Sequence, residues 1–282
     1  MSSSNLDLIV LTYNEELNLE YCLQSVQGLV QNIFVVDSGS TDQTVNIARQ
    51  FKAHVVYHPF TTQTEQLNWA LDNLPIQSEW VLRLDGDEHL LPELRDEIAG
   101  TLHTVPPEIS GFYIKRRMIF LGRWIRHGGY YPTWILRLFR HKKARSEVIA
   151  MNEHVALSEG RSARLANDFV DEEHEGLGAW ILKHEGFASR QARVLSQMDK
   201  GYDSGWIRPD LLGEQPQRKR WLLHHFYRRL PLFLRSFFYF FYRYFFRFGF
   251  LDGPQGLIFH FLQGCWYPFY TDAKLYEGRP RR

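Results

Sequence analysis

The chain has 282 residues, of which 44% are hydrophobic and 23% are charged. This composition is typical of a folded protein and excludes collagen-like, extensively disordered and wholly membrane-embedded chains. Its 33 Lys and Arg nearly balance its 32 Asp and Glu, which argues against a general nucleic-acid-binding protein, because such proteins carry a large basic surplus. At about 150 residues per domain, the length predicts one large domain or one domain with an appendage.

Two features bear on the cellular compartment. The cysteines, Cys22 and Cys265, lie far apart and form no CxxC pair, so a reducing compartment is favoured over a disulfide framework. The amino terminus has neither the basic start nor the long apolar core of a secretory signal. We therefore expect a cytoplasmic protein.

Residues 6–95 alternate between short β-branched apolar runs and longer segments of helical period, the pattern of βαβ units around a parallel sheet. The hydroxyl of Ser40 is expected to cap the second helix, because Gln43 follows it at capping-box spacing. The expected elements are strands at 6–12, 33–37, 54–57 and 80–84, and helices at 16–28, from Ser40 onward, and at 64–74.

The alternation fails after about residue 106. Basic strands and loops from 112 to 155 predict an antiparallel or mixed extension of the sheet, and a helix is expected at 178–198. The predicted fold class is therefore α/β, with a mostly parallel sheet and helices on both faces over residues 1–200 and a helical region at 201–282.

Acidic residues follow two of the expected strands. Asp85 and Asp87 form an Asp-x-Asp turn after one strand, and Asp37 ends another. Such sheets bind ligands at the carboxyl ends of their strands, and Mg²⁺ or Mn²⁺ binds through one or two carboxylates together with substrate phosphates. The pattern predicts a nucleotide with Asp37 at its base or ribose and the Asp-x-Asp at a metal-bound diphosphate. The alternative for an isolated Asp-x-Asp is a solvated turn.

The segment after the first strand contains no glycine-rich phosphate loop. It reads Tyr13-Asn14-Glu15-Glu16, with neither GxGxxG nor GxxxxGK[ST]. Dinucleotide-dependent dehydrogenases and P-loop enzymes are therefore disfavoured. Without a backbone cradle, a pyrophosphate would need the metal that the Asp-x-Asp turn can hold.

Four successive segments carry a resemblance to a known family. They are residues 11–16 (LTYNEE), 36–42 (VDSGSTD), 66–71 (QLNWAL) and 84–88 (LDGDE). In order and spacing they resemble the motifs of family 2 glycosyltransferases, and most of all the branch that adds sugars to lipopolysaccharide core or to lipid-linked exopolysaccharide precursors. The resemblance is strong over residues 5–100 and weaker to about residue 200.

The resemblance implies a glycosyltransferase A fold, a nucleotide-sugar donor such as a UDP-sugar, a Mg²⁺ or Mn²⁺ ion, and inversion at the anomeric carbon. Residues 1–105 would bind the donor and residues 106–200 the acceptor. The metal would be held by Asp85 and Asp87. The residues that the resemblance places at the nucleotide sugar are Thr12, Tyr13, Glu15, Asp37, Gln66, Asn68, Asp85 and Asp87. For Gln66 and Asn68, a polar helix face over the sheet is an equal alternative.

Inversion by a single displacement needs a general base within hydrogen-bond reach of the acceptor hydroxyl. In the related branch an Asn/His-Glu motif follows the basic strands, and here residues 151–155 read MNEHV. The resemblance therefore makes Glu153 the candidate base, with an ordinary surface glutamate as the alternative. The acidic cluster at 171–173 is a second candidate, although three adjacent acids more often form a solvated turn.

A basic stretch lies between Arg123 and Arg145, where seven Lys or Arg occur without an acid. Such a local excess attracts anions, so one interpretation is a site for phosphorylated lipid or an anionic glycan. The other is a solvated edge that discourages strand aggregation. The aromatic residues of this stretch are candidates either for stacking on sugar rings or for the core: Trp124, Tyr130, Tyr131 and Trp134.

Residues 218–250 combine basic and aromatic side chains. Fourteen Phe and Tyr lie between Phe226 and Phe250, and eight Lys or Arg but no Asp or Glu lie between Arg218 and Arg247. The uncharged stretches are far shorter than the ~20 apolar residues of a spanning helix. On a helix, the arginines at 228, 229, 235, 243 and 247 fall within about a 120° arc. We predict a membrane-interface segment with arginines on anionic lipid; a buried helix or a dimer interface is the alternative.

The combined prediction is an inverting, metal-dependent hexosyltransferase. It would move a sugar from a nucleotide sugar to a membrane-bound glycan or glycolipid in lipopolysaccharide or exopolysaccharide assembly, at the cytoplasmic face of the inner membrane. A nucleotidyltransferase would also use paired acids and a metal, but the sequence lacks its Gly-rich, Lys- or Arg-containing loop. The other alternative is an inactive membrane-associated scaffold, which would tolerate replacement of Asp85 and Asp87.

Overall fold

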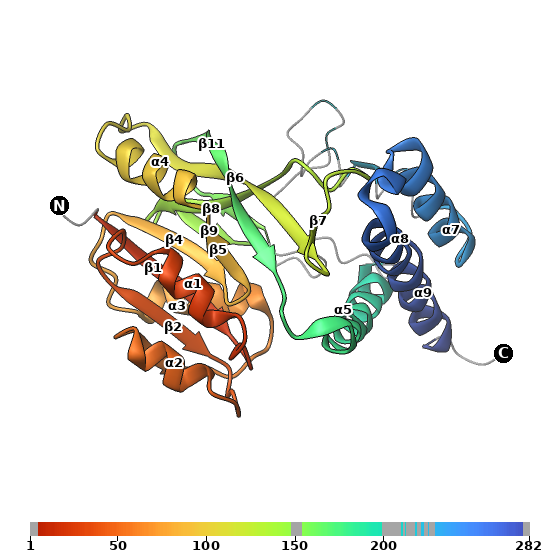
Figure 1. The fold of residues 1–282 in the computed structure, drawn as a ribbon, viewed down its shortest axis with the longest axis horizontal. Helices are drawn as coiled ribbons and strands as arrows, with labels where there is room; N and C mark the ends of the chain where they lie inside the picture. The colour runs from red at the N-terminus through yellow and green to blue at the C-terminus, as the bar shows by residue number, and fades with distance from the viewer. Residues whose placement is uncertain are drawn as a thin grey trace. The chain divides into compact units, whose positions relative to one another are not determined.

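The structure is a computed structural model that describes residues 5–147, 154–198 and 229–278, together with residues 210, 212, 218, 221, 222 and 225. The chain divides into two compact units. Unit 1 comprises residues 1–119, 132–147 and 153–174, and unit 2 comprises residues 120–131, 148–152 and 175–282. Figure 1 shows the elements of each unit along the chain.

Unit 1 contains a mixed sheet. Its strands β3, β2, β1 and β4 are parallel and adjacent in that order, and β8, β6, β11 and β5 extend the sheet beyond β4 with antiparallel and parallel pairs. A separate hairpin pairs β9 with β10. The elements are β1 (Leu6–Thr12), α1 (Leu19–Ser25), β2 (Ile33–Asp37), α2 (Thr44–Gln50), β3 (His54–Tyr57), α3 (Gln63–Asn73), β4 (Trp80–Asp85), β5 (Glu88–Leu90), α4 (Pro92–Leu102), β6 (Ile109–Phe120), β8 (Thr133–Arg140), β9 (Ala144–Ser146), β10 (Val155–Leu157) and β11 (Arg161–Glu172).

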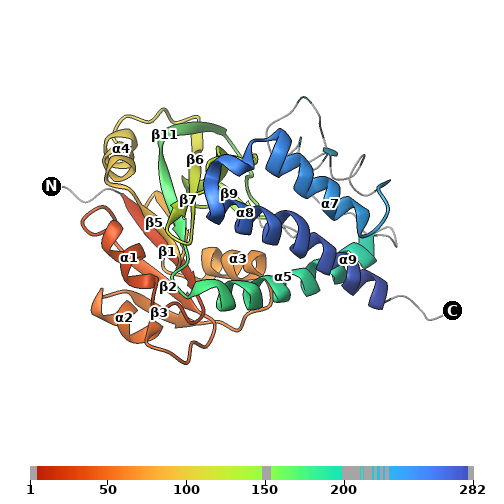
Figure 2. The same cartoon turned by 45° about the vertical axis from the view of Figure 1, so that its right-hand side comes forward.

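Helices cover both faces of the parallel strands. Side chains of a strand alternate between faces: Leu8 and Val10 of β1 pack in the cluster that includes α1, α2 and α4, whereas Ile9 and Leu11 pack in the cluster that includes α3. Figure 2 shows α1 and α2 on one side of these strands and α3 on the other. Because both faces are covered, the strands are almost continuously apolar.

This arrangement confirms the predicted α/β class. The first three strands lie at the predicted residues, and β4 is one residue longer than expected. The predicted cap at Ser40 is wrong, because its hydroxyl donates to Asp37 and accepts the N–H of Asn14. The second helix consequently begins only at Thr44. Ser40 therefore serves the strand ends, while Asp42 Oδ1 accepts the N–H of Thr44, the first residue of the helix, at 2.9 Å.

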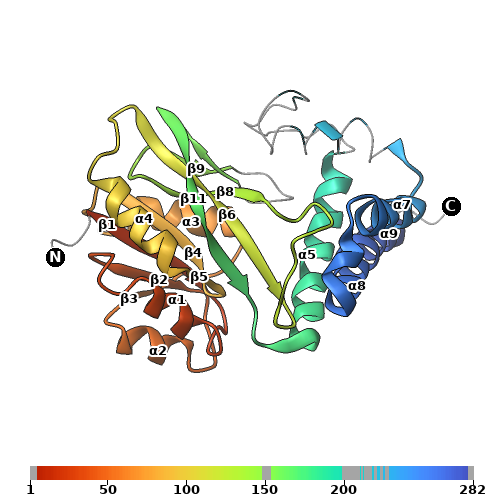
Figure 3. The same ribbon diagram turned by 45° about the horizontal axis from the view of Figure 1, so that its top comes forward.

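Unit 2 is mainly helical. Its elements are β7 (Arg123–Trp124), α5 (Gly176–Met198), α7 (Leu234–Phe241), a π-helical turn (Tyr242–Phe246), a 3₁₀ turn (Gly249–Asp252), α8 (Gly253–Phe261), a second π-helical turn (Leu262–Trp266) and α9 (Tyr267–Glu277). Figure 3 shows α5 beside α9. The Tyr267 hydroxyl donates to Gln191 Oε1 at 2.5 Å, and Ala188 of α5 is buried. These contacts group α5 with the C-terminal helices.

The arginines predicted to face anionic lipid do not all do so. Arg235 is buried and its Nε donates to both carboxylate oxygens of Asp272, at 3.0 and 2.9 Å. Arg243 is also buried, and its Nε donates to the carbonyl of Gly128 at 2.8 Å. The prediction is wrong for these two residues, because internal acceptors hold their guanidinium groups. Arg228 and much of 218–228 lie outside the described residues.

No helix in the described part of the chain combines the length and the apolar character needed to cross a membrane. Cys22 and Cys265 are free and buried.

Candidate functional site

The carboxyl ends of β1, β2 and β4 lie side by side in unit 1. Thr12 is the register partner of Asp37, and Leu11 is the partner of Asp85. The Thr12 hydroxyl donates to Asp37 Oδ1 at 3.2 Å. The fold therefore brings Thr12, Asp37 and the Asp-x-Asp turn to the edge of the sheet where ligands of α/β proteins bind.

Asp37 organises the loop that follows it. Its Oδ2 accepts the N–H groups of Gly39 and Ser40, each at 2.9 Å, and its Oδ1 accepts the hydroxyls of Thr12 and Ser40. The side chain is only 4% exposed, and a buried carboxylate requires donors of this kind. Asp37 thus shapes the strand-end loop, while its contact with a nucleoside stays a prediction.

The loop after β1 is bound to the loop after β2. The N–H of Asn14 donates to the Ser40 hydroxyl at 2.8 Å, and Asn14 Oδ1 accepts the N–H of Thr41 at 2.8 Å. Asn14 has a φ of 55°, a left-handed conformation that asparagine tolerates better than most residues. The preceding ring, Tyr13, is exposed. An exposed ring held beside polar strand ends suits stacking on a nucleobase.

Two buried arginines hold the first carboxylate of the Asp-x-Asp turn. Arg83 Nη1 and Arg137 Nη2 donate to Asp85 Oδ2 at 2.7 and 3.0 Å. Arg137 also contacts Glu88 Oε1, and Glu88 Oε2 accepts the N–H of Asp85 at 3.1 Å. Burial raises the pKa of the Glu88 carboxyl, and the charge of Asp85 adds to the rise. Buried charges are tolerated inside a protein only when they are paired, and here the two arginines pair with Asp85 and Glu88. Because Glu88 also accepts the N–H of Asp85, this network fixes the backbone of the turn.

Gly86 allows Glu15 to lie against the Asp-x-Asp turn. A Cβ on Gly86 would stand 2.7 Å from Glu15 Cγ. Glu15 Oε2 accepts the side-chain N–H of Asn18 at 2.7 Å, and Asn18 Oδ1 accepts the N–H of His174 at 2.9 Å. The predicted site residue Glu15 is therefore at the turn, and the chain around His174 reaches the same place from the far end of the unit.

The second acidic cluster also lies at this turn. β11 pairs with β5 so that Asp171 is opposite Glu88, and the N–H of Glu172 donates to the carbonyl of Asp87 at 3.0 Å. Asp171 accepts from Arg116 Nη1 at 3.1 Å. Asp171 and Glu172 are thus strand residues beside the Asp-x-Asp turn and not a solvated turn of their own.

The two predicted residues of α3 have different surroundings. Gln66 is buried and its Nε2 donates to the Ser38 hydroxyl, 2.6 Å away, in the strand-end loop. Asn68 instead exchanges two hydrogen bonds with the main chain of Ser146 in β9, at 2.9 and 3.0 Å. The structure brings Gln66 to the other predicted residues, whereas the amide of Asn68 holds a neighbouring strand.

The donor set of the turn fits a divalent cation whose remaining ligands come from a substrate. Asp85 and Asp87 supply carboxylate oxygens, which Mg²⁺ and Mn²⁺ prefer. Both carboxylates are candidate ligands, and the two guanidinium contacts of Asp85 reach its Oδ2. Within the described ranges, no group of three or more His, Cys, Asp or Glu side chains could hold a metal by itself. Phosphate oxygens and water would have to complete the shell.

The candidate base Glu153 lies outside the described residues. In the basic stretch, Arg137 contacts Glu88, Arg140 contacts Glu79, Lys143 Nζ lies 2.6 Å from Glu159 and Arg145 Nη2 lies 2.7 Å from Asp72. Four of the seven basic side chains of this stretch therefore pair with acids from other parts of the chain. Of the aromatic residues there, Tyr130 packs edge-on to Phe259 inside unit 2, with ring centroids 4.6 Å apart.

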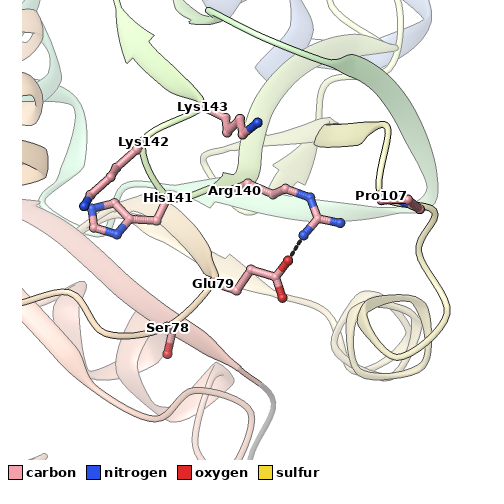
Figure 4. Close-up of a pocket in the computed structure, with 7 residues that line it drawn as sticks. All are labelled: Ser78, Glu79, Pro107, Arg140, His141, Lys142 and Lys143. Atoms are coloured by element: carbon pink, nitrogen blue, oxygen red, sulfur yellow. Dashed lines mark ion pairs between the residues drawn. The ribbon is translucent and has the colours of Figure 1, made fainter.

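A cavity of about 400 Å³ lies elsewhere in unit 1, and Figure 4 shows its lining. Ser78 and Glu79 of this cavity directly precede β4, so it opens at the amino end of the strand whose carboxyl end carries Asp85. The ion pair between Arg140 and Glu79 occupies part of its wall. Its position at the opposite strand ends separates it from the candidate site.

Sequence reasoning missed Arg83, Glu88 and Arg137 as site residues. A signal existed for Arg83, because an arginine inside the apolar strand WVLRLD must be paired if it is buried. In the sequence, Arg137 is one of the seven basic residues of the basic stretch. Nothing local in the sequence indicates that β8 would place it against β4.

The chain is similar in sequence to several known glycosyltransferases. Over 89 residues the chain is 39% identical to an uncharacterized glycosyltransferase of Rickettsia felis, covering 32% of this chain and 31% of that protein. Over 153 residues it is 29% identical to the lipopolysaccharide core biosynthesis glycosyltransferase LpsC of Rhizobium meliloti, covering 51% and 53%. The chain thus matches about a third to a half of the length of these relatives.

A solved structure shares the fold over nearly the whole chain. The mannosyltransferase PcManGT of Pyrobaculum calidifontis, determined with GDP-Man and Mn²⁺, covers 99% of this chain and 89% of its own with a TM-score of 0.54 and 14% identity. At that identity the likeness concerns the fold alone. Residues 7–152, more than half of the chain, match the sequence model described as Glycosyl transferase family 2. Together with the strand-end motifs, this match places the chain in glycosyltransferase family 2.

Proposed function

We propose that this protein is an inverting glycosyltransferase that transfers a sugar from a nucleotide-sugar donor, most simply a UDP-sugar, with the help of Mg²⁺ or Mn²⁺. The observation that carries the proposal is the edge of the sheet in unit 1. There Asp37 and the Asp85–Asp87 turn flank the end of β1, because Thr12 pairs with Asp37 and Leu11 with Asp85. A nucleoside diphosphate can lie across β1 with its base toward Asp37 and its phosphates toward Asp87.

The protein groups have separate tasks in this proposal. The Tyr13 ring stacks on the base and the Asp37 loop bounds the nucleoside. Arg83 and Arg137 are positioning residues, since they hold Asp85 and with it the turn that carries Asp87. A Mg²⁺ or Mn²⁺ ion would be held by Asp85 and Asp87 and would supply positive charge for the diphosphate leaving group. Preorganisation of this kind lowers the reorganisation needed during reaction.

The reaction is a single displacement. The acceptor oxygen forms a bond to the anomeric carbon, the bond from that carbon to the diphosphate oxygen breaks, and a carboxylate takes the proton of the acceptor hydroxyl. Glu153 is the first candidate for that base. Glu172 is the second, since the hydrogen bond from its N–H to Asp87 places it beside the Asp-x-Asp turn.

The acceptor in this proposal is a membrane-bound glycan or glycolipid of lipopolysaccharide or exopolysaccharide assembly, reached at the cytoplasmic face of the membrane. Two observations support it. LpsC, which is similar to half of this chain, is named for lipopolysaccharide core biosynthesis. Unit 2 also exposes many large apolar side chains between residues 234 and 261.

A thermal-stability screen of the full chain tests donor binding. UDP, GDP, CMP and ATP are each added with and without Mn²⁺ to the wild type, to Asp87→Asn, and to Asp96→Asn, an exposed acid of α4 that serves as the control. A ligand that binds only the folded state stabilises it by ~2.7 kcal/mol at one hundred times its dissociation constant. We expect a Mn²⁺-dependent shift with one nucleoside diphosphate that Asp87→Asn loses and Asp96→Asn keeps.

The same screen separates the alternatives. A shift specific to a nucleoside triphosphate would favour a nucleotidyltransferase, and the absence of any shift would favour an inactive scaffold. Once the donor is known, Glu153→Gln and Glu172→Gln distinguish the bases. The variant of the true base should bind the donor normally and lose transfer by ~10²-fold or more.

A further inference from the structure

The helical segment 234–246 of unit 2 has an inverted distribution of polarity. Its exposed apolar side chains recur every three or four residues and so form one stripe along the helix. They are Leu234, Phe237, Phe238, Phe241, Phe245 and Phe246, and the rings of Tyr239 and Tyr242 are exposed beside them. The opposite side carries Arg235, Ser236 and Arg243, all of which are buried. A helix of a water-soluble domain normally turns these two faces the other way.

The two buried arginines have acceptors within unit 2, whereas the buried Ser236 hydroxyl has no hydrogen-bond partner among the described residues. Arg235 pairs with Asp272, and the same carboxylate accepts the N–H of Phe233 at 2.8 Å. Arg243 donates to the Gly128 carbonyl and to the Tyr239 hydroxyl at 2.8 and 3.1 Å, and its guanidinium lies 3.8 Å from the centre of the Tyr130 ring. Internal satisfaction of polar groups is what a hydrocarbon environment demands.

Asp252, in the 3₁₀ turn that follows, is also buried and also has its hydrogen-bond partners inside unit 2. Asp252 accepts from the backbone and ring nitrogens of His127, at 2.9 and 2.7 Å. Burial alone would raise the pKa of Asp252, but the nearby His260 ring and the hydrogen bonds from His127 lower it to about 2. Outside this buried acid, the surface again carries apolar groups, including Leu257 and Phe261 of α8.

The chemistry of this surface selects its occupant. Residues 234–261 are all described, and of their Asp, Glu, Lys and Arg side chains only that of Arg247 is exposed. A protein partner would require about one hydrogen bond per 100–200 Å² and a polar rim. The exposed polar groups of this surface include Arg247 and the hydroxyls of Tyr239 and Tyr242, and both hydroxyls already accept hydrogen bonds from arginines. Lipid chains require no hydrogen bonds. The segment has eight α-helical and five π-helical residues, too few for the ~20 needed to span a bilayer.

We infer that residues 234–261 form a membrane-insertion face that enters one leaflet and contacts lipid acyl chains with its Phe and Leu side chains. The inference deepens the proposed function and rests on it only for the lipid-linked acceptor. This mode of attachment differs from the predicted one, in which arginines contact anionic lipid, because Arg235 and Arg243 are buried on the inner side of the face. Attachment should therefore depend on apolar burial and not on anionic headgroups.

Flotation of the full chain with vesicles tests the inference. One vesicle is phosphatidylcholine alone and the other contains phosphatidylglycerol in addition, each at low and at high NaCl. We expect the two dissociation constants to agree within about threefold and to change little with salt, since added salt screens exposed charges but not apolar burial. Binding that requires the anionic lipid and disappears in salt would overturn the inference.

A pair of substitutions locates the face. Phe246 and Leu182 of α5 are each 74% exposed, so Leu182→Lys is a matched control for Phe246→Lys. We expect Phe246→Lys to weaken binding to phosphatidylcholine by about tenfold or more, because a charge is costly in hydrocarbon, and Leu182→Lys to leave it nearly unchanged. Equal loss in both variants would overturn the assignment to this face.

Two further readouts keep the interpretations apart. The chain could instead fail to bind vesicles and sediment as a dimer that Phe246→Lys converts to a monomer. In that case the face is a self-association surface and the inference is wrong. The Mn²⁺-dependent nucleotide shift should persist in Phe246→Lys, which shows that the variant is folded. Absence of the Mn²⁺-dependent nucleotide shift in the wild type would instead refute the proposed function, and the vesicle-binding result would still hold.

Discussion

Replacing Arg137 with methionine removes the guanidinium that contacts both Glu88 and Asp85. The side chains of Arg137 and Glu88 are 8% and 1% exposed, so the variant leaves a buried carboxylate without its ion-pair partner. Breaking a buried pair from one side costs ~3–5 kcal/mol. That is a large fraction of the ~5–15 kcal/mol by which a domain is normally stable. Arg137→Met should therefore lower the free energy of unfolding severely.

Urea unfolding measures the effect on the buried Arg137, and the exposed Arg145 supplies the control. Arg145 pairs bidentately with Asp72, but these side chains are 42% and 52% exposed. Arg145→Met should cost less than ~1 kcal/mol, because surface ion pairs contribute little. The double variant Arg137→Met/Glu88→Gln should recover much of the loss, since no uncompensated charge remains. A cost below ~1 kcal/mol for Arg137→Met, or no recovery in the double variant, would refute the reasoning.

Three other outcomes are expected. Asp37→Asn replaces a carboxylate oxygen with an amide donor, so the bonds to Gly39 and Ser40 weaken and urea unfolding should show a loss of ~1–3 kcal/mol. Gly86→Ala places a methyl group against Glu15; isothermal titration should show at least ~10-fold weaker nucleotide binding with an unchanged circular dichroism spectrum. Burial lowers the pKa of His184 to about 4, below its ordinary ~6.5. The folded state therefore resists protonation, and stability present above pH ~6.5 should fall by ~3 kcal/mol as the pH approaches 4. His184→Phe should flatten this pH dependence in denaturant titrations, and an unchanged slope would contradict the assignment.

Much of the donor half could be predicted without coordinates. Local hydrophobic pattern placed β1 at 6–12 and β2 at 33–37, because a strand buried on both faces needs a short continuous apolar run. The order of elements then indicated a parallel sheet, and such a sheet brings its carboxyl strand ends to one edge. Thr12, Asp37 and Asp85 meet there for that reason.

Other parts of the site depend on long-range pairing. Glu88 meets Arg137 only because β8 lies against β4, and His174 meets Asn18 only because β11 returns beside β5. These partners are 49 and 156 residues apart in the chain. No local pattern specifies such a contact, since it is set by the register of strands from different parts of the sequence.

The C-terminal helices show the limit most clearly. The sequence by itself determined that residues 234–246 form a helix-period pattern with arginines on one side and aromatic rings on the other. It did not determine which side faces inward, because the periodicity of an amphipathic helix is the same in either orientation. Only the tertiary structure decided this, by placing Asp272 opposite Arg235 and the Gly128 carbonyl opposite Arg243. Those internal acceptors draw the arginines inward and leave the rings outside.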